Sequence, residues 1–343
     1  MTKKIVVLPG DGIGKEVVPA GVALLRSLGL PLEFEEFDVN VERYLGVGRA
    51  MSEEAFAAIE AADAVYLGAF GDPRVQEPDY QAQVLRHLRV TFDLYANVRP
   101  AKLLDDSLSP LRRKDRRPLD LVVLRENTEG LYSHLGGRFR QRTDQEVAVV
   151  EHVNTYHGVT RIIEYAFRIA RREVCMVDKW NAMPASGALW HERFKTVALR
   201  HPHLRARHLM IDAAAAHLVR DPTQFDVIVA ENCFGDILSD LAGELAGGIG
   251  MSPSGNFNPD GQRAVFEPVH GSAPDIAGQG IANPIAAIRT GGMILEHFGY
   301  HEEARALEAA IVAAIKAGER TRDLGGTLST REAAAAIARR LHA

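Results

Sequence analysis

Three carboxylates stand where they could hold a cation. Asp236 and Asp240 lie four residues apart in CFGDILSDLAGEL, which places them on one face of a helix, and Asp212 ends the strand-like stretch RHLMID. Carboxylates gathered without histidine or cysteine favour a hard ion such as Mg²⁺ or Mn²⁺. A solvated helix face would also explain the pair. Apolar neighbours such as Phe234 and Leu238, however, make unpaired acids costly unless they bind something.

Four arginines precede these acids. Arg86 and Arg89 lie three apart in YQAQVLRHLRVTFD, hence on one expected helical face. Arg99 and Arg125 occupy strand edges, in YANVRP and VVLRE. A guanidinium holds a carboxylate by two parallel hydrogen bonds, which lysine cannot reproduce. If these arginines converge, they suit a substrate with several carboxylates, although any one of them could instead be a solvated surface residue.

Two further residues could move protons. Lys179 closes the strand-like EVCMVDK, and Tyr132 ends the loop RENTEGLY. A lysine near a cation-bound hydroxyl and a phenol near a carbon that needs a proton make a base and an acid. Taken alone, a lysine at a strand end is usually solvated.

The elements that must position these residues follow an α/β pattern. Short β-branched runs alternate with longer amphipathic stretches, which predicts a buried and largely parallel sheet. The glycine-rich PGDGIGKEV (Pro9–Val17) leads from a strand into a helix, where backbone N–H groups can receive an anion. Its spacing does not match the G-x-G-x-x-G of a Rossmann fold. The expected strands lie in KIVVLP, DAVYLGAF, DLVVLRE, EVCMVDK, RHLMID and FDVIVAEN.

Two segments stand outside this alternation. Residues Leu135 to Val150 place turn residues between alternating ones and predict a hairpin arm, which usually meets a partner. The alanine-rich tail predicts two helices, Glu302–Ala317 and Thr330–Leu341.

The bulk composition excludes some classes of protein. A chain of 343 residues exceeds one ordinary hydrophobic core, and a net charge of -5 without a basic stripe argues against nucleic-acid binding. Cys175 and Cys233 both lie in apolar strand-like runs, as reduced thiols do, which predicts a cytoplasmic location. The apolar run near the N-terminus is too short for a signal peptide or a spanning helix, so no membrane partner is expected.

Together these motifs resemble the β-decarboxylating dehydrogenases, the family of isocitrate, homoisocitrate, 3-isopropylmalate and tartrate/D-malate dehydrogenases. The resemblance runs from PGDGIGKEV through FDLYANVRP, VVLRENTEGLY, FDVIVAENCFGDILSDLAG and VFEPVHGSAPDIAGQGIANPIAAI to DLGG at Asp323–Gly326. It implies a two-domain α/β fold of the isocitrate/isopropylmalate dehydrogenase type, which is not a Rossmann fold. Residues 1–98 and 255–343 would form the cofactor-side domain. Residues 99–254 would form the substrate, metal and dimerisation domain, with the arm at about 133–152.

The resemblance also implies roles for individual residues. The reaction would be NAD-linked oxidation of a 3-substituted malate at its C2 hydroxyl, followed by loss of CO₂. Lys179 and Asp212 would reach the site from a second subunit, so the active form would be a homodimer, which could pair into a tetramer. Lys179, Tyr132 and Asp212 would be catalytic, and Asp212, Asp236 and Asp240 would bind Mg²⁺ or Mn²⁺. The substrate would contact Arg86, Arg89, Arg99, Arg125, Tyr132, Lys179 and Asn181.

The choice of cofactor is implied by VHGSAPDIAG. Family members that use NAD carry an acid where Asp275 stands, since it can bond a free ribose 2′-OH and repels a 2′-phosphate. Asn283 would contact the adenine, and Gly271 to Ala273 would form the adenosine loop. The expected NAD-binding residues are Ile13, Glu267, His270, Gly271, Ser272, Ala273, Asp275, Ile276 and Asn283.

The substrate depends on Arg86. Isopropylmalate enzymes usually have leucine at this position, and a cation beside the C3 substituent favours one that ends in a carboxylate. We therefore expect homoisocitrate or isocitrate, with 3-isopropylmalate, and so leucine biosynthesis, as the alternative. D-malate or tartrate comes next, because GAFGDPRV (Gly68–Val75) and SGNFNPDG (Ser254–Gly261) resemble those enzymes and some isopropylmalate enzymes.

Two other classes stay open. A metal-dependent hydrolase could use the aspartates and arginines, but it would leave the Asp275 loop without a task. A catalytically silent regulatory subunit is disfavoured because every expected catalytic position is filled.

Overall fold

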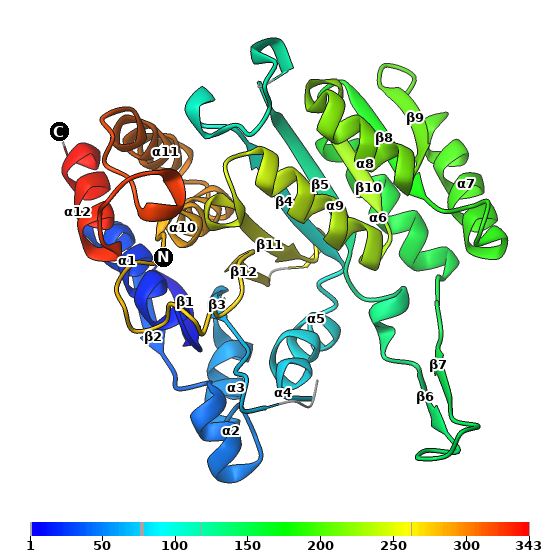
Figure 1. Ribbon diagram of the computed structural model, residues 1–343, viewed down its shortest axis with the longest axis horizontal. Helices are drawn as coiled ribbons and strands as arrows, with labels where there is room; N and C mark the ends of the chain where they lie inside the picture. Colours follow the sequence, from blue (N-terminus) through cyan, green and yellow to red (C-terminus); the bar gives the residue numbers. More distant parts are fainter. Residues whose placement is uncertain (1, 76–78, 117, 262, 343) are drawn as a thin grey trace.

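A single large sheet organises the molecule. The computed structural model describes residues 2–75, 79–116, 118–261 and 263–342. Its sheet strands are β1 (Lys3–Gly10), β2 (Leu32–Glu36), β3 (Ala64–Ala69), β4 (Ala96–Lys102), β5 (Asp120–Glu126), β8 (Glu173–Asp178), β9 (Arg205–Met210), β10 (Val227–Ala230), β11 (Pro253–Phe257) and β12 (Ala264–Pro268). Their order is β2-β1-β3-β12-β11-β4-β5-β10-β8-β9, and the sheet crosses the whole molecule (Figure 1).

The sheet is parallel at both ends and antiparallel in the middle. β11 pairs antiparallel with β12 and β4, and β4 pairs antiparallel with β5. The other pairs are parallel. The predicted parallel sheet is therefore confirmed except at its centre. There, the short link between β11 and β12 leaves no room for a crossover, and only antiparallel neighbours can be joined that way.

Two predicted strands end earlier than expected. RHLMID stops at Met210, and Asp212 lies in the first turn of α8 (Ile211–Arg220). FDVIVAEN stops at Ala230, so Cys233 lies in helix α9 (Asn232–Leu245) and not in a strand. Glu231 starts that helix, because its carboxylate accepts the N–H groups of Cys233 and Phe234.

The helices cover both faces of the sheet. They are α1 (Gly14–Ser27), α2 (Val41–Val47), α3 (Glu53–Ala61), α4 (Asp79–Gln81), α5 (His87–Thr91), α6 (Tyr156–Ile169), α7 (Pro184–Ala198), α8, α9, α10 (Ile285–His297), α11 (His301–Lys316) and α12 (Thr330–Leu341). The two predicted tail helices are confirmed to within one residue, and a capping box between Ser329 and Glu332 starts the second. No helix in the described ranges is long and apolar enough to cross a membrane.

The hydrophobic core is divided along the chain. One cluster combines residues near the start of the chain with residues near its end, around β1, α1, α10 and α11. A second uses residues 6 to 94 together with Val265, around β1, α2, α3 and β3. Two others use residues 95 to 246, around α6 to α9. This separation agrees with a domain division near residues 98 and 254, which we retain as a proposal, while the sheet runs unbroken between the two halves.

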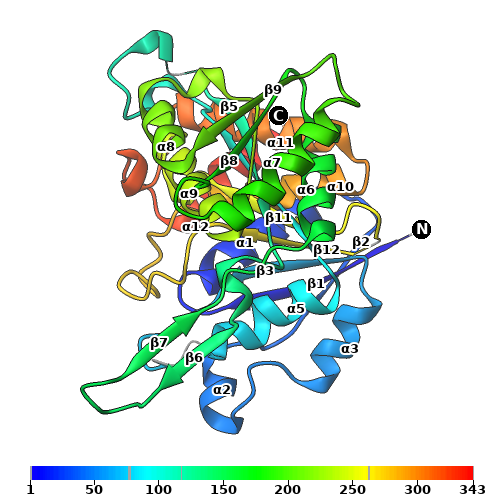
Figure 2. The ribbon, with the colours of Figure 1, turned by 90° about the vertical axis from the view of Figure 1, so that its right-hand side faces the viewer.

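The predicted arm is an antiparallel hairpin. It consists of β6 (Gly136–Phe139) and β7 (Val147–Val150) and projects from the body of the molecule (Figure 2). Leu135, Phe139 and Val150 leave 52%, 58% and 65% of their surface exposed. An isolated two-stranded hairpin is marginally stable in water, and these apolar side chains suit a surface that a second molecule covers.

Candidate active site

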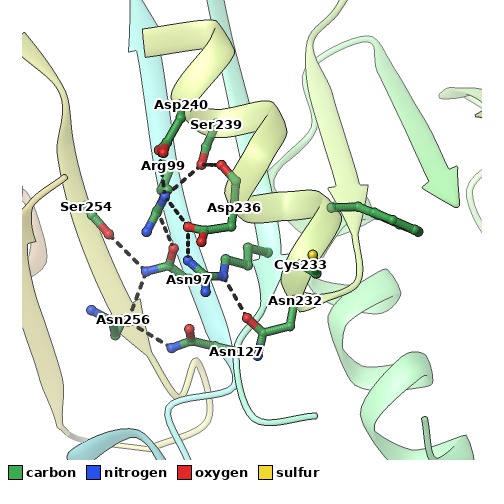
Figure 3. A network of polar contacts seen from close by, with 12 residues as sticks. Asn97, Arg99, Asn127, Asn232, Cys233, Asp236, Ser239, Asp240, Ser254 and Asn256 are labelled. Atoms are coloured by element: carbon green, nitrogen blue, oxygen red, sulfur yellow. Dashed lines mark hydrogen bonds and ion pairs between the residues drawn. The ribbon is translucent and has the colours of Figure 1, made fainter. Parts of the chain in front are cut away.

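Two arginines and two aspartates meet where β4, β5 and α9 come together. Arg99 in β4 donates from Nη1 to Asp236 Oδ1 at 2.9 Å and to Asp240 Oδ1 at 3.2 Å. Arg125 in β5 also pairs with Asp236 through its Nη1. Both acids reach down from one face of α9 (Figure 3). The structure thus brings four of the expected site residues into one cluster.

The electrostatics of this cluster favour an anion. Arg125 is 4% exposed, and burial together with the charges of Arg99 and Arg89 lowers its pKa to about 9. Burial raises the pKa of Asp240, and the charge of Asp236 adds to this while Arg99 opposes it. Three guanidinium groups share this region with two aspartates. Because buried charge is costly without partners, a substrate that brings carboxylates fits here.

An amide network links the arginines, and the sequence-based predictions missed it. Asn97 Oδ1 accepts a bond from Arg99 Nε at 2.8 Å, while its Nδ2 donates to Asn256 Oδ1 at 2.9 Å. Asn256 donates onward to Glu267 Oε1 at 3.0 Å, which also accepts from Arg89 Nη2 at 3.1 Å. The two-residue period of a strand could have predicted part of this network, because the side chains at positions 97 and 99 of one strand face the same side of the sheet.

Arg89 keeps one donor free for a ligand. Its Nε atom is buried and has no hydrogen-bond partner among the described residues, although its Nη2 binds Glu267. A buried donor without a partner costs free energy of about 1–3 kcal/mol. An incoming carboxylate would remove that cost.

Arg86 does not join the cluster. It closes a π-helical turn (Ala82–Arg86) ahead of α5, is exposed, and donates from Nη2 to the Ser133 carbonyl at 2.9 Å. The guanidinium groups of Arg86 and Arg89 bind partners in different elements, so their joint action on a substrate stays a prediction. Leu88, between these two arginines, is 1% exposed and packs within a core cluster.

Tyr132 lies at the edge of the cluster. The Arg125 guanidinium stands 5.5 Å from the centre of its ring, and the ring is 42% exposed. Burial, a side-chain bond to Cys233 and the charge of Asp236 raise the pKa of Tyr132 to about 12. The phenol therefore stays protonated at neutral pH, as a proton donor must.

Lys179 and Asp212 form a separate pair. Lys179 Nζ donates to Asp212 Oδ1 at 2.5 Å, and this bond lowers the pKa of Asp212. Asn181, two residues on, is exposed. Within the described part of the chain, Asp212 does not share a group of close ligand atoms with Asp236 and Asp240. The expected three-aspartate site is therefore not assembled within one chain.

The expected cofactor residues surround the first glycine loop. Ile13 N donates to the Ser272 carbonyl at 2.9 Å, and a Cβ on Gly12 would lie 1.9 Å from that oxygen, so only glycine fits there. His270 is 7% exposed, with Nε2 buried and unpartnered in the described structure, and burial lowers its pKa. A groove of about 530 Å³ runs beside the loop. It is lined by Gly12, Lys15, Gly71, Arg74, Pro274 and Gly278.

The remaining cofactor residues differ in how free they are. Asp275 is exposed, and within the described ranges it accepts a bond only at its backbone oxygen, from Gln279 at 2.8 Å. Gly271 is exposed, and Ala273 and Ile276 are half-buried. Asn283, by contrast, is 7% exposed, with Nδ2 bonded to Asp323 at 2.8 Å and Oδ1 accepting from Ile285 N. Glu267 belongs to the arginine network. Asp275 is thus the side chain most available to a ribose.

Asp236 and Asp240 suit a divalent cation. They offer carboxylate oxygens only, which Mg²⁺ and Mn²⁺ prefer. The Asp240 side chain is 52% exposed, so water can complete a coordination shell. Arg99 forms an ion pair with each of these two carboxylates, so its guanidinium supplies the positive charge beside them. The donor set therefore fits the metal that the sequence predicted.

Comparisons with known proteins identify the family of the chain. The family model described as "Isocitrate/isopropylmalate dehydrogenase" matches residues 4–337. The chain is 43% identical to a 3-isopropylmalate dehydrogenase of Streptomyces coelicolor over 96% of this chain and 98% of that protein. It is also 43% identical to one of Bifidobacterium longum subsp. infantis, over 95% of each.

Solved structures give the same result. An isocitrate dehydrogenase from Methylococcus capsulatus superposes with a TM-score of 0.92 at 35% identity, covering 100% of both chains. A β-decarboxylating dehydrogenase from Thermococcus kodakarensis superposes at 0.81 with 34% identity, covering 99% of this chain and 96% of that one. The chain therefore belongs to the isocitrate/isopropylmalate dehydrogenase family, the NAD-dependent decarboxylating dehydrogenases that act on a CH–OH group and need Mg²⁺ or Mn²⁺.

Proposed function

We propose that the protein oxidises and decarboxylates 3-isopropylmalate, a step of leucine biosynthesis. The observation that carries this choice is the bond from Arg86 to the Ser133 carbonyl, which gives the guanidinium a partner in its own chain in place of a substrate carboxylate. The expectation of homoisocitrate or isocitrate required Arg86 to face the C3 substituent. The relatives at 43% identity, named 3-isopropylmalate dehydrogenase, favour the same alternative.

Substrate binding would use the buried arginines. Arg99 and Arg125 already hold one carboxylate oxygen of Asp236, so a malate carboxylate can replace part of that pairing without further desolvation of either guanidinium group. Arg89 would use its free Nε. The amide network fixes Arg89 and Arg99, and Asn232 holds Arg125, before substrate arrives, which lowers the entropy lost on binding.

Proton transfers would fall to Lys179 and Tyr132. Asp236 and Asp240 would hold the cation, with Asp212 and Lys179 supplied by a second subunit. When bound, the cation supplies charge that favours loss of the C2 hydroxyl proton and stabilises the enolate, and NAD supplies the hydride acceptor. Lys179 would accept the hydroxyl proton. Tyr132, protonated at neutral pH, would deliver a proton to C3 after CO₂ leaves.

The expected cofactor contacts remain part of this proposal. Asp275 would bond the ribose hydroxyls, and the residues from His270 to Ile276 with Ile13 would form the cofactor groove. Asn283 would reach the adenine only by exchanging its bond to Asp323. Homodimers, further pairing into tetramers and a cytoplasmic location also remain predictions.

Isocitrate is the second candidate. The Methylococcus capsulatus relative is an isocitrate dehydrogenase, and Arg86 is exposed on a π-helical turn, where a rotation would bring it toward the substrate. The case for D-malate or tartrate as the substrate rests only on the resemblance of two sequence segments. All of these substrates therefore belong in one assay.

The test is NADH production with Mn²⁺ on 3-isopropylmalate, isocitrate, homoisocitrate, D-malate and tartrate. We expect the highest kcat/KM on 3-isopropylmalate, and little change in the substrate ratios of Arg86→Val. Arg49→Val is the matched control, because Arg49 is also an exposed arginine and lines the same surface groove as Arg86. A wild-type preference for isocitrate or homoisocitrate that disappears in Arg86→Val alone would overturn the proposal.

A further inference from the structure

Three side chains with metal-binding atoms meet beyond the site described above. Asp178 ends β8, His208 lies in the neighbouring strand β9, and His191 lies in α7. His208 Nε2 stands 2.8 Å from Asp178 Oδ1, and His191 Nε2 stands 3.2 Å from Asp178 Oδ2. The two Nε2 atoms are 3.2 Å apart. This is the only group of this kind within the described residues.

Hydrogen bonds alone cannot satisfy this triangle. It has three contacts, and each contact needs a proton between its two atoms. An ionised carboxylate supplies no proton, and an imidazole, neutral or charged, carries at most one on Nε2, so the two rings supply at most two. If both protons point to Asp178, the two N–H groups face each other at 3.2 Å. If one points to the other ring, a carboxylate oxygen loses its donor.

The structure shows that one oxygen does lack a donor. Asp178 is 5% exposed, and its Oδ2 atom has no hydrogen-bond partner among the described residues, although it lies within ion-pair distance of His191. Oδ1, in contrast, accepts from Trp180 N at 3.2 Å as well as facing His208. A buried carboxylate oxygen without a donor is costly. It therefore points toward a missing positive partner.

The spacing of the three atoms fits a tetrahedral metal. Ligands about 2.0–2.1 Å from a zinc ion at tetrahedral angles lie about 3.3 Å from one another. The three edges observed are 2.8, 3.2 and 3.2 Å. A single ion would then contact all three atoms after shifts of a few tenths of an ångström.

The surroundings hold the rings and leave a way in. The side chains of His191 and His208 are 15% and 25% exposed, so water can reach a fourth coordination position. Trp180 packs on His191 with ring centres 4.2 Å apart, which restricts the imidazole. Burial and the nearby His208 lower the pKa of His191, which keeps its lone pair available at neutral pH.

We propose that Asp178, His191 and His208 form a second cation site, which binds Zn²⁺ with water as the fourth ligand. Two imidazoles and one carboxylate suit Zn²⁺, whereas the all-carboxylate pair Asp236 and Asp240 suits Mg²⁺ or Mn²⁺. The site ties β8, β9 and α7 together directly before Lys179. We expect a bound Zn²⁺ to stabilise this region of the fold. The proposed zinc site therefore does not depend on which malate is the substrate.

The experiment uses purified full-length protein freed of metal with EDTA and then loaded with Co²⁺ or Zn²⁺. Four-coordinate Co²⁺ absorbs visible light far more strongly than six-coordinate Co²⁺. We expect a strong visible band that saturates at one Co²⁺ per chain and is displaced by Zn²⁺, and a melting temperature that rises with Zn²⁺ concentration. The band should vanish in His191→Gln and in His208→Gln. It should persist in His203→Gln, an exposed histidine nearby, and in Asp240→Asn.

A measurement on the unaltered protein removes the risk that a variant misfolds. X-ray absorption at the zinc edge of the loaded wild type should show two imidazole ligands and oxygen ligands at about 2.0 Å. A zinc environment without imidazole, a Co²⁺ spectrum of only six-coordinate type, or a band unchanged in both histidine variants would overturn the proposal. Dehydrogenase activity decides the proposed function separately.

Discussion

Asp236 and Asp240 have different tasks although they share a helical face. Asp236 accepts from both Arg99 and Arg125, so it compensates two buried cations. Among the residues that the structure describes, Asp240 accepts only from Arg99, at 3.2 Å, and its side chain is 52% exposed. Substituting one should therefore affect folding and chemistry differently from substituting the other.

Asp240→Asn should abolish most of kcat while leaving the metal-free melting temperature close to wild type, since it removes a cation ligand but only one long ion pair. Asp236→Asn should also lose activity, and in addition lose about 1–3 kcal/mol of metal-free stability, because two charge-assisted bonds weaken. Activity assays and thermal unfolding in EDTA measure both effects. Full activity in either variant would contradict the metal assignment.

Asp275 should set the nucleotide preference. Its exposed carboxylate can accept bonds from a free ribose and would repel a 2′-phosphate. We expect NAD to exceed NADP by at least about tenfold in kcat/KM, equivalent to roughly 1.4 kcal/mol. Asp275→Ser should narrow this ratio, whereas Asp106→Ser, at an exposed acid elsewhere, should not. Equal use of both nucleotides by the wild type would refute the assignment.

At the scale of elements, the end of β5 carries a buried acid beside the site. Glu126 is 2% exposed and accepts bonds from Thr128 N, Thr128 Oγ1 and Glu129 N, which shape the turn that leads to Tyr132. Burial nevertheless raises the pKa of Glu126 to about 7. The turn therefore depends on a carboxyl group that titrates near neutral pH.

The raised pKa of Glu126 makes the free energy of unfolding depend on pH. Between the ordinary value of 4.5 and about 7, folded Glu126 retains a proton that the unfolded chain has released, so its contribution to stability falls as pH rises. The loss is at most about 3 kcal/mol. Urea unfolding at pH 5 and pH 8 should show a smaller pH effect in Glu126→Gln than in the wild type or in the exposed control Glu33→Gln. Identical pH effects in all three proteins would rule this out.

At the scale of the whole molecule, the candidate site is incomplete in one chain. Lys179 and Asp212 pair with each other, and among the described residues Asp212 shares no group of close ligand atoms with Asp236 and Asp240. The arm displays apolar side chains that need a cover. Both observations fit a symmetric dimer in which each subunit completes the site of the other.

Mixed dimers test this arrangement. Lys179→Met and Asp240→Asn should each be nearly inactive alone. When they are denatured and refolded together, each mixed dimer would contain one site without either substitution, so about a quarter of wild-type activity should return in an equal mixture. In the control, each variant is denatured and refolded alone at the same total protein concentration. No recovery, with mixed dimers shown to form by mass spectrometry, would mean that the sites are not shared.

The sequence alone determined the α/β class, the hairpin arm, the tail helices and the acids of α9. These features depend on periodicity and turn chemistry, which act over a few residues. It also identified Arg99 and Arg125 as strand residues near a charged site.

Only the tertiary structure decided which side chains meet at each site, because those contacts join residues that are far apart in the sequence. The antiparallel centre of the sheet brings Asn97 to Asn256 and Arg89 to Glu267, and no local pattern encodes contacts between residues more than a hundred positions apart. The partner of Arg86 is likewise set by the turn that carries Ser133. Asp178, His191 and His208 meet only because β8 and β9 are adjacent and α7 packs over them. A helical period gives the face of a side chain, but packing decides what that face meets.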